Sequence, residues 1–221
     1  MRPWHVMGTA ELFDRLASRY DAWYEGPAGA AVFPSEVACL RPLLAGLPRP
    51  WVEIGVGSGR FAGALRVEAG LDPAAAPLVL ARSRGVAVVR GVGERLPFRD
   101  GVFGAALIVV TMCFADDPAA LVAEARRVIR EDGAVVLGEV FAESAWGRFY
   151  QRKGLAGHPF YSAARFLTRD QTLALVDGAG LRVRAARSVL YQPPCDTPLP
   201  ETPRGGEGPE AGFVCWQATP A

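Results

Sequence analysis

Three glycines at alternate positions follow a short apolar segment, and this is the part of the chain whose spacing points most directly to chemistry. Residues 51 to 59 read Trp-Val-Glu-Ile-Gly-Val-Gly-Ser-Gly. Glycine lets the backbone take positive φ and lets a ligand approach the main chain without meeting a Cβ. Residues 60–65 continue as a helix whose first amide groups face the turn. Strand, glycine turn and helix form the first half of a βαβ unit and predict a nucleotide-type cofactor site.

Two registers of this turn lead to different reactions. Residues 57–62 fit the dinucleotide pattern G-x-G-x-x-G/A, but a lone match of this kind is weak and gives Glu53 and Gly55 no role. The pattern Glu-x-Gly-x-Gly-x-Gly uses all four residues and resembles the first motif of class I S-adenosylmethionine-dependent methyltransferases. The resemblance implies that the turn passes beside the methionine part of the cofactor and that Glu53 helps to hold its ammonium group. It assigns Gly55, Gly57, Ser58 and Gly59 to cofactor binding.

A second acid follows at the end of the next predicted strand. Residues 69–73 read Ala-Gly-Leu-Asp-Pro, so that Asp72 and Pro73 stand at the start of a helix. The Asp72 carboxylate could accept both hydroxyls of a ribose. Dinucleotide enzymes use an acid in the same way, so Asp72 supports the fold without choosing the cofactor.

The resemblance extends through residues 91 to 103. Small-molecule members of the family often carry Ala-Glu-x-Leu-Pro-Phe-x-Asp-x-Ser-Phe-Asp. This chain matches that pattern at Glu94, Leu96, Pro97, Phe98, Asp100 and Phe103, and departs from it at Gly93, Val102 and Gly104. Val92 stands where many relatives place an acid near the adenine amino group. Adenine is therefore expected to rest on backbone groups around Gly93 and Glu94.

Residues 116 to 140 resemble a further block of the family, with Asp-Pro, an amphipathic helix, a turn and a strand. Asp117 suits the helix cap and Pro118 the first turn. The resemblance thus covers residues 51 to 140 through four ordered motifs.

The expected fold is α/β, a doubly wound Rossmann-like sheet of seven mostly parallel strands with an antiparallel last strand and a small helical cap. One domain spans residues 1–221, with cap helices in 1–48, a cofactor-binding core in 49–140, a substrate-cap insertion in 141–167 and a C-terminal helix and strands in 168–221. Helices are expected at about 9–24, capped by Thr9, and at about 34–45 and 169–178. Strands are expected at about 51–55, 69–72, 86–90, 104–110, 134–140, 181–190 and 213–218, and a Pro/Gly-rich loop at 192–212.

The first helix is expected to cover the cofactor. Residues 20–24, Tyr-Asp-Ala-Trp-Tyr, resemble a segment often found at the start of these enzymes. An aromatic face near a sulfonium stabilises the cation by about 0.5–2 kcal/mol. Tyr20 is therefore a candidate cofactor-binding residue. Plain packing remains open for Tyr20, Trp23 and Tyr24.

The methyl acceptor is expected at the carboxyl end of the fourth strand, beside Thr111, Met112 and Cys113. This segment lacks the Asp-Pro-Pro-Tyr or Asn-Pro-Pro-Tyr element of enzymes that methylate amino groups of bases or of glutamine. His158, in the aromatic-rich insertion, is a candidate base or a structural residue. Cys113 is a candidate nucleophile or a buried inert thiol. The aromatic side chains of the insertion could wall the acceptor or form a small core; these are Trp146, Phe149, Tyr150, Phe160 and Tyr161.

Composition limits the kinds of partner that the chain is expected to bind. A net charge of +1 over 221 residues gives no sign of the basic surface that nucleic-acid binding requires, so no nucleic-acid partner is expected. The longest apolar stretch, 102–115, is too short to span a bilayer and the first twenty residues lack a signal-type segment, so no membrane partner and a cytoplasmic location are expected. Four cysteines and two histidines without ligand spacing predict no metal site. A monomer and a homodimer both remain open.

These observations predict a methyltransferase that uses S-adenosylmethionine and transfers its methyl group to N, O or S of a small molecule by in-line displacement, leaving S-adenosylhomocysteine. One alternative is an NAD(P)-dependent reductase on the same fold, although Tyr150 precedes the only lysine, Lys153, by three residues instead of the four of a Tyr-x-x-x-Lys pair. The other is a protein that binds S-adenosylmethionine without catalysis.

Overall fold

The computed structural model describes residues 8–221, which form a central sheet of eight strands. The spatial order of the strands is β3-β2-β1-β4-β5-β8-β6-β7. Their bounds are β1 Trp51–Ile54, β2 Ala69–Asp72, β3 Ala87–Arg90, β4 Phe103–Val109, β5 Ile129–Glu139, β6 Leu181–Val189, β7 Arg204–Gly205 and β8 Phe213–Pro220.

Strand direction confirms the expected fold class. The five strands from β3 to β5 pair in parallel, and β8 runs antiparallel between β5 and β6. The predicted count of seven is short by one, because β7 adds two residues antiparallel to β6 inside the expected 192–212 loop. Two residues are too few to show any alternation of apolar and polar side chains.

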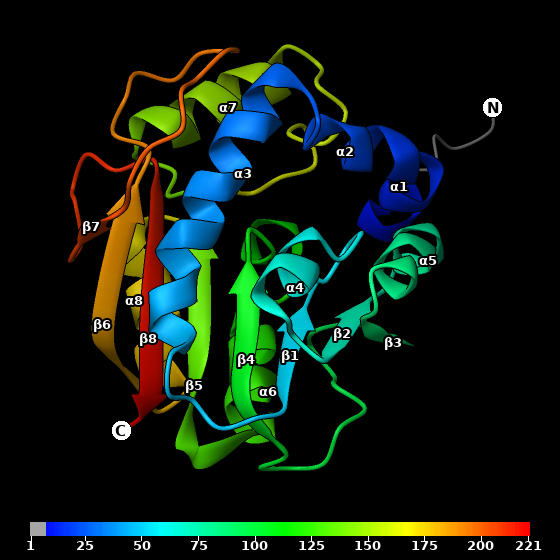
Figure 1. Ribbon diagram of the computed structural model, residues 1–221, viewed down its shortest axis with the longest axis vertical. Coiled ribbons are helices and arrows are strands. Elements are labelled where there is room, and N and C mark those ends of the chain that lie inside the picture. The colour runs from blue at the N-terminus through cyan, green and yellow to red at the C-terminus, as the bar shows by residue number, and fades with distance from the viewer. Residues whose placement is uncertain (1–7) are drawn as a thin grey trace, which may run out of the picture.

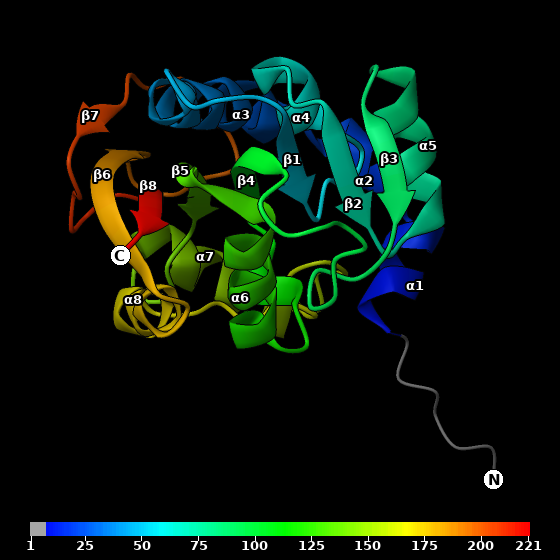
Figure 2. The same cartoon turned by 90° about the horizontal axis from the view of Figure 1, so that it is seen from below.

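Helices cover both faces of the sheet (Figures 1 and 2). On one face lie α3 (Pro27–Leu40) and α4 (Arg60–Leu65), and on the other α6 (Pro118–Val128) and α8 (Arg169–Gly178). The remaining helices are α1 (Thr9–Arg15), α2 (Ala17–Trp23), α5 (Ala75–Ser83), α7 (Ala145–Leu155) and the short 3₁₀ turns η1 (Arg41–Leu44) and η2 (Met112–Phe114). Asp117 accepts from the amides of Ala119 and Ala120, which confirms it as the cap of α6.

Three predicted boundaries are wrong. The helix expected over 9–24 is two helices, because Leu16 leaves the helical region at φ −114°, ψ 17°; Gly8, not Thr9, is the first N-cap. The helix expected from 34 begins at Pro27 and carries Pro34 inside it. β5 begins at Ile129, five residues before the predicted 134, because Ile129 already pairs with Phe103 of β4 before a shift in register.

The carboxyl ends of β1, β4 and β5 point to one edge of the sheet, the upper edge in Figure 1, where α2 and α7 also lie. The ends of adjacent parallel strands, the turns that follow them and the covering helices therefore meet at one place, which is where open α/β sheets bind ligands.

Candidate functional site

The three glycines of the turn after β1 differ in what surrounds them. Gly55, Gly57 and Gly59 have φ of 76°, 50° and 77°. A Cβ on Gly55 would lie 2.3 Å from Thr111 Cγ2, and one on Gly59 would lie 2.8 Å from Ala81. A Cβ on Gly57 meets only the Tyr20 ring, at 3.5 Å. The outer glycines thus allow neighbouring chain segments to pack, whereas Gly57 faces open space.

Asp72, at the end of β2, is bonded to this turn. Its Oδ2 accepts from the Gly57 amide and its Oδ1 from the Ala74 amide, both at 2.9 Å. Burial raises the pKa of the Asp72 carboxyl, and the two amides oppose that shift. Each carboxylate oxygen accepts more than one hydrogen bond, so the group can still receive hydroxyl donors.

A cavity of about 470 Å³, here called the glycine-turn cavity, opens beside Gly57 and Asp72. Eight of the twelve predicted cofactor residues line it: Tyr20, Gly55, Gly57, Asp72, Pro73, Gly93, Glu94 and Thr111. Gly8, Thr9 and Phe13 close it from the side of α1. Phe13 therefore borders this cavity and is only half-buried.

The four other predicted residues lie beneath the turn or in the core. Ser58 and Met112 are buried outside the lining, and Gly59 packs on α5. Glu53 is 2% exposed; it accepts the Ala62 amide, while its Oε2 has no hydrogen-bond partner. Burial raises the pKa of Glu53 to about 8. Glu53 is therefore not among the residues that line the glycine-turn cavity.

The loop that carries Gly93 and Glu94 is tied to α6. Arg127 donates to the carbonyls of Leu96 (3.1 Å) and Phe98 (2.8 Å), and Glu94 accepts from the Asp116 amide at 3.0 Å. Two of the blocks noted in the sequence, 91–103 and 116–140, therefore form one hydrogen-bonded unit at the wall of the cavity.

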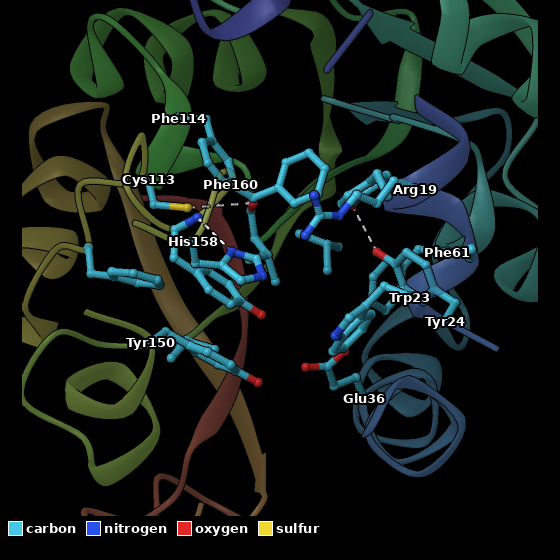
Figure 3. Close-up of a pocket in the computed structure, with 17 residues that line it drawn as sticks. Arg19, Trp23, Tyr24, Glu36, Phe61, Cys113, Phe114, Tyr150, His158 and Phe160 are labelled. Carbon is cyan, nitrogen blue, oxygen red and sulfur yellow. Dashed lines mark hydrogen bonds between the residues drawn. The ribbon is translucent and has the colours of Figure 1, made fainter. Parts of the chain in front are cut away.

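A second space of about 410 Å³, here called the aromatic cavity, adjoins the first (Figure 3). Four residues line both: Tyr20, Val109, Val110 and Phe114. Its walls are mainly aromatic rings from α2, α4, η2, α7 and the segment after α7; these are Tyr20, Trp23, Tyr24, Phe61, Phe114, Tyr150, Phe160, Tyr161 and Phe166. The Tyr20 and Tyr24 hydroxyls are 2.9 Å apart, so one donates to the other.

Val110 lies at the junction of the two cavities in a strained conformation. Its φ is 48°, in a region that β-branched residues seldom occupy. Its amide donates to the Gly138 carbonyl at 2.8 Å, which fixes the turn at the end of β4. Such strain costs about 1–3 kcal/mol and is found most often at functional sites.

The aromatic insertion is divided between this cavity and the core. Tyr150, Phe160 and Tyr161 line the cavity, whereas Phe149 and Trp146 do not. Trp146 is 1% exposed and donates to the Gln192 carbonyl at 3.0 Å, so it is part of the core.

His158 and Cys113 both reach the aromatic cavity. Burial, with smaller contributions from Lys153 and Arg19, lowers the pKa of His158, which leaves a neutral ring at neutral pH. Its Nδ1 accepts from the Tyr161 amide at 3.4 Å, so its ring proton is on Nε2. Burial, and then Glu139, raises the pKa of Cys113, which favours the unreactive thiol over the thiolate.

Glu36 was not predicted as a site residue, yet it lines the aromatic cavity from α3 and is only 6% exposed. It stands four residues from the buried Val32 and Leu40. That spacing, with a single acid in an otherwise apolar helix, is the signal that could have found it. Burial raises the pKa of Glu36 well above its usual range.

An ionic contact holds α2 over the site. Asp21 accepts from Arg60 Nε and Nη2 on α4, both at 2.8 Å, and from Arg84 after α5 at 2.9 Å. Burial alone would raise the pKa of Asp21, but the two guanidinium groups lower it to about 2. The carboxylate therefore holds α2 in place at neutral pH, with Tyr20 at both cavities and Tyr24 at the aromatic cavity.

Between residues 8 and 221, no cluster of three or more His, Cys, Asp or Glu side chains could hold a metal ion. In the same range no helix is long and apolar enough to cross a membrane.

Residues 52–137 match the family model of a methyltransferase domain. An uncharacterised protein of Mycobacterium tuberculosis is 44% identical over 188 residues, or 85% of this chain and 66% of the relative, so the chain spans just under two thirds of that protein's length. An uncharacterised protein of Methanocaldococcus jannaschii is 31% identical over 94% of this chain and 98% of its own.

Among solved structures, a Thermotoga maritima protein described as a SAM-dependent methyltransferase, possible histamine N-methyltransferase, is similar over 96% of this chain and all of its own. It shares 32% identity and a TM-score of 0.86. With the parallel sheet and the glycine turn, these similarities place the chain in the class I S-adenosylmethionine-dependent methyltransferase family.

Proposed function

We propose that the protein is a methyltransferase that binds S-adenosylmethionine in the glycine-turn cavity and a small-molecule acceptor in the aromatic cavity. The observation that carries the proposal is that the two cavities adjoin and share Tyr20, Val109, Val110 and Phe114. A donor in one and an acceptor in the other would meet at these residues. Both volumes, about 470 and 410 Å³, suit small molecules.

The residues around the glycine-turn cavity fit the cofactor. Asp72 would hold the ribose hydroxyls, the Gly57 turn would lie along the methionine part, and the backbone at Gly93 and Glu94 would hold the adenine. The space before Gly57 supports this assignment, since a side chain there would occupy it. Glu53, buried beneath the turn with an unpartnered oxygen, would act on the ammonium group from behind the main chain.

S-adenosylmethionine, when bound, supplies an electrophilic methyl group that a nucleophile displaces from sulfur. The protein itself would orient the acceptor and exclude water. Helix α2, held in place by the contacts of Asp21 with Arg60 and Arg84, would cover the site for this purpose. Among the candidate groups, Cys113 is a buried thiol and the His158 Nδ1 is already bonded, so neither is assigned as a base. An amine or thiol acceptor needs none once it is neutral.

The acceptor class draws support from the T. maritima relative, whose description names a small amine as its possible acceptor. The cytoplasmic location and the choice between monomer and homodimer stay predictions. The reductase alternative gains no support from the structural relative, whereas a SAM-binding protein without turnover is separated from an enzyme only by assay.

The test is to incubate the protein with S-adenosylmethionine and mixed small amines, alcohols and thiols, and to follow S-adenosylhomocysteine. Formation that depends on an added acceptor, and that Asp72→Ala reduces, supports the proposal. Tight binding of S-adenosylmethionine with no turnover on any acceptor class would contradict it in favour of the non-catalytic alternative.

A further inference from the structure

Glu36 is a buried carboxyl that points into the aromatic cavity. It lies on α3 with 6% of its surface exposed. Figure 3 shows its carboxyl group and the Tyr150 hydroxyl directed toward each other from opposite walls. The cavity is therefore lined on the α3 side by an acid; aromatic and aliphatic side chains form most of the remaining wall, which also includes Arg19, Cys113 and His158.

Nothing in the described part of the chain, residues 8–221, pairs with this acid. Two acids beside the glycine turn do have backbone donors: the buried Glu53 accepts from Ala62, and the part-buried Asp72 accepts from Gly57 and Ala74. No hydrogen bond or ion pair is present at the Glu36 carboxyl in that range. A buried carboxyl group without a partner keeps its proton, and it ionises only when a cation lies beside it, so a ligand that supplies a cation would pair with it.

The walls around Glu36 favour an organic cation over an inorganic one. The rings of Tyr20, Tyr24 and Tyr150 border the same cavity, and aromatic faces attract ammonium groups. A metal ion would need several oxygen or nitrogen ligands, which this cavity does not gather. The combination of one carboxylate, aromatic walls and about 410 Å³ suits a basic nitrogen attached to an apolar body.

We propose that Glu36 binds the cationic nitrogen of the acceptor and that the aromatic cavity therefore selects organic amines. This inference rests on the proposed function and names the acceptor class for the same site. A neutral alcohol of the same shape would bring no positive charge for the acid to pair with, and an anionic acceptor would be repelled once the acid ionised. Where the paired nitrogen is itself the nucleophile, its N–H bond breaks and the proton passes to a Glu36 oxygen, which frees the lone pair.

The experiment is calorimetric binding to protein saturated with S-adenosylhomocysteine. The probes are tryptamine and 2-phenylethylamine, their neutral counterparts tryptophol and 2-phenylethanol, and trimethyl(2-phenylethyl)ammonium, which keeps its charge at every pH. An amine should bind about 10- to 100-fold more tightly than its alcohol, the range expected of a hydrogen bond to a charged group. This comparison uses the wild-type protein and requires no variant to fold.

Glu36→Gln keeps the shape and removes the charge. It should abolish the preference for amine over alcohol and leave the affinity for S-adenosylhomocysteine unchanged. Glu131→Gln is the matched control, because its side chain is 82% exposed and lies outside both cavities; it should retain the preference.

Equal binding of amines and alcohols, binding of no amine by the loaded protein, or a preference that survives Glu36→Gln would each overturn the inference while the proposed function stands. Failure of S-adenosylhomocysteine to bind would instead overturn the proposed function, and the inference with it.

Discussion

The Gly57 amide donates to Asp72 Oδ2 at 2.9 Å, which joins the glycine turn after β1 to the acid at the end of β2. The glycine turn and Asp72 were predicted from separate motifs, and Gly57 and Asp72 are fifteen residues apart in the sequence. The bond means that the same carboxylate that would receive the ribose also holds the turn in its shape. A substitution at Gly57 or at Asp72 should therefore also disturb the other residue.

Replacing Asp72 with Ala should weaken binding of S-adenosylhomocysteine about 10- to 100-fold, because hydrogen bonds to a charged group are lost. Calorimetric titration measures the change. Asp177→Ala removes a half-exposed carboxylate that pairs with Arg182 after α8, and should bind as the wild type does. Near-native affinity in Asp72→Ala would show that the ribose lies elsewhere.

Alanine at Gly57 should separate cofactor binding from folding. Gly85→Ala provides the matched control, because Gly85 has φ 84° and open space around it, so it reports the cost of positive φ alone. Gly57→Ala should lower the melting temperature about as much as Gly85→Ala, yet only Gly57→Ala should weaken binding of S-adenosylhomocysteine. Equal binding by both variants would remove Gly57 from the site.

Gly59→Ala should behave in the opposite way, with a larger loss of stability. Its added Cβ would lie 2.8 Å from the Ala81 Cα, and a main chain inside a packed helix cannot easily move aside. Thermal unfolding of Gly59→Ala beside Gly85→Ala measures this. A melting temperature equal to that of Gly85→Ala would contradict the packing of α4 on α5.

Removal of the Asp21 carboxylate should loosen α2. Asp21→Ala leaves Arg60 and Arg84 without their shared partner, so residues 17–23 should exchange amide hydrogens faster and both ligands should bind more weakly. Glu25→Ala is the control, since Glu25 also pairs with Arg60 but is 73% exposed. Unchanged hydrogen exchange in Asp21→Ala would mean that packing alone holds α2.

Stability should fall as pH rises because of Glu53. The pKa of Glu53 is about 4.5 in the unfolded chain and about 8 in the fold, so between these values the folded state keeps a proton that the unfolded state has released. The contribution is complete below about pH 4.5 and declines with rising pH by at most about 1.4 kcal/mol per pH unit until about pH 8.

Between about pH 4.5 and pH 8, Glu53→Gln should therefore lose less stability than the wild type. Denaturant unfolding at a series of pH values measures the difference. The acids Glu36 and Glu139, whose pKa values burial also raises, contribute the same sign in both proteins and cancel in the comparison. Parallel pH profiles for wild type and variant would show that Glu53 is ionised in the fold.

Much of the sheet could be predicted because its signals are local. β2 and α8 have the predicted bounds, and α8 begins at a capping box between Thr168 and Gln171. The glycine turn, Asp72 and the 91–103 loop came from motifs that are read over a few residues. The break at Leu16 could not be predicted, because neither Gly nor Pro marks it.

The division of the aromatic side chains could not be predicted because it depends on distant contacts. Trp146 and Tyr150 lie four residues apart on α7, yet Trp146 fills the space above Gly212, where a Cβ would be 2.1 Å from its ring, and Tyr150 lines the cavity. Likewise, periodicity can place Glu36 inside the protein, but only the packed structure directs it into a cavity.

The assigned roles of both cavities depend most on the identity of the cofactor, so the decisive measurement is calorimetric titration of the protein with S-adenosylhomocysteine and, separately, with NADH and NADPH. We predict micromolar binding of S-adenosylhomocysteine and no binding of either nicotinamide nucleotide. Binding of a nicotinamide nucleotide without S-adenosylhomocysteine would contradict the assignment of the glycine-turn cavity and restore the reductase alternative.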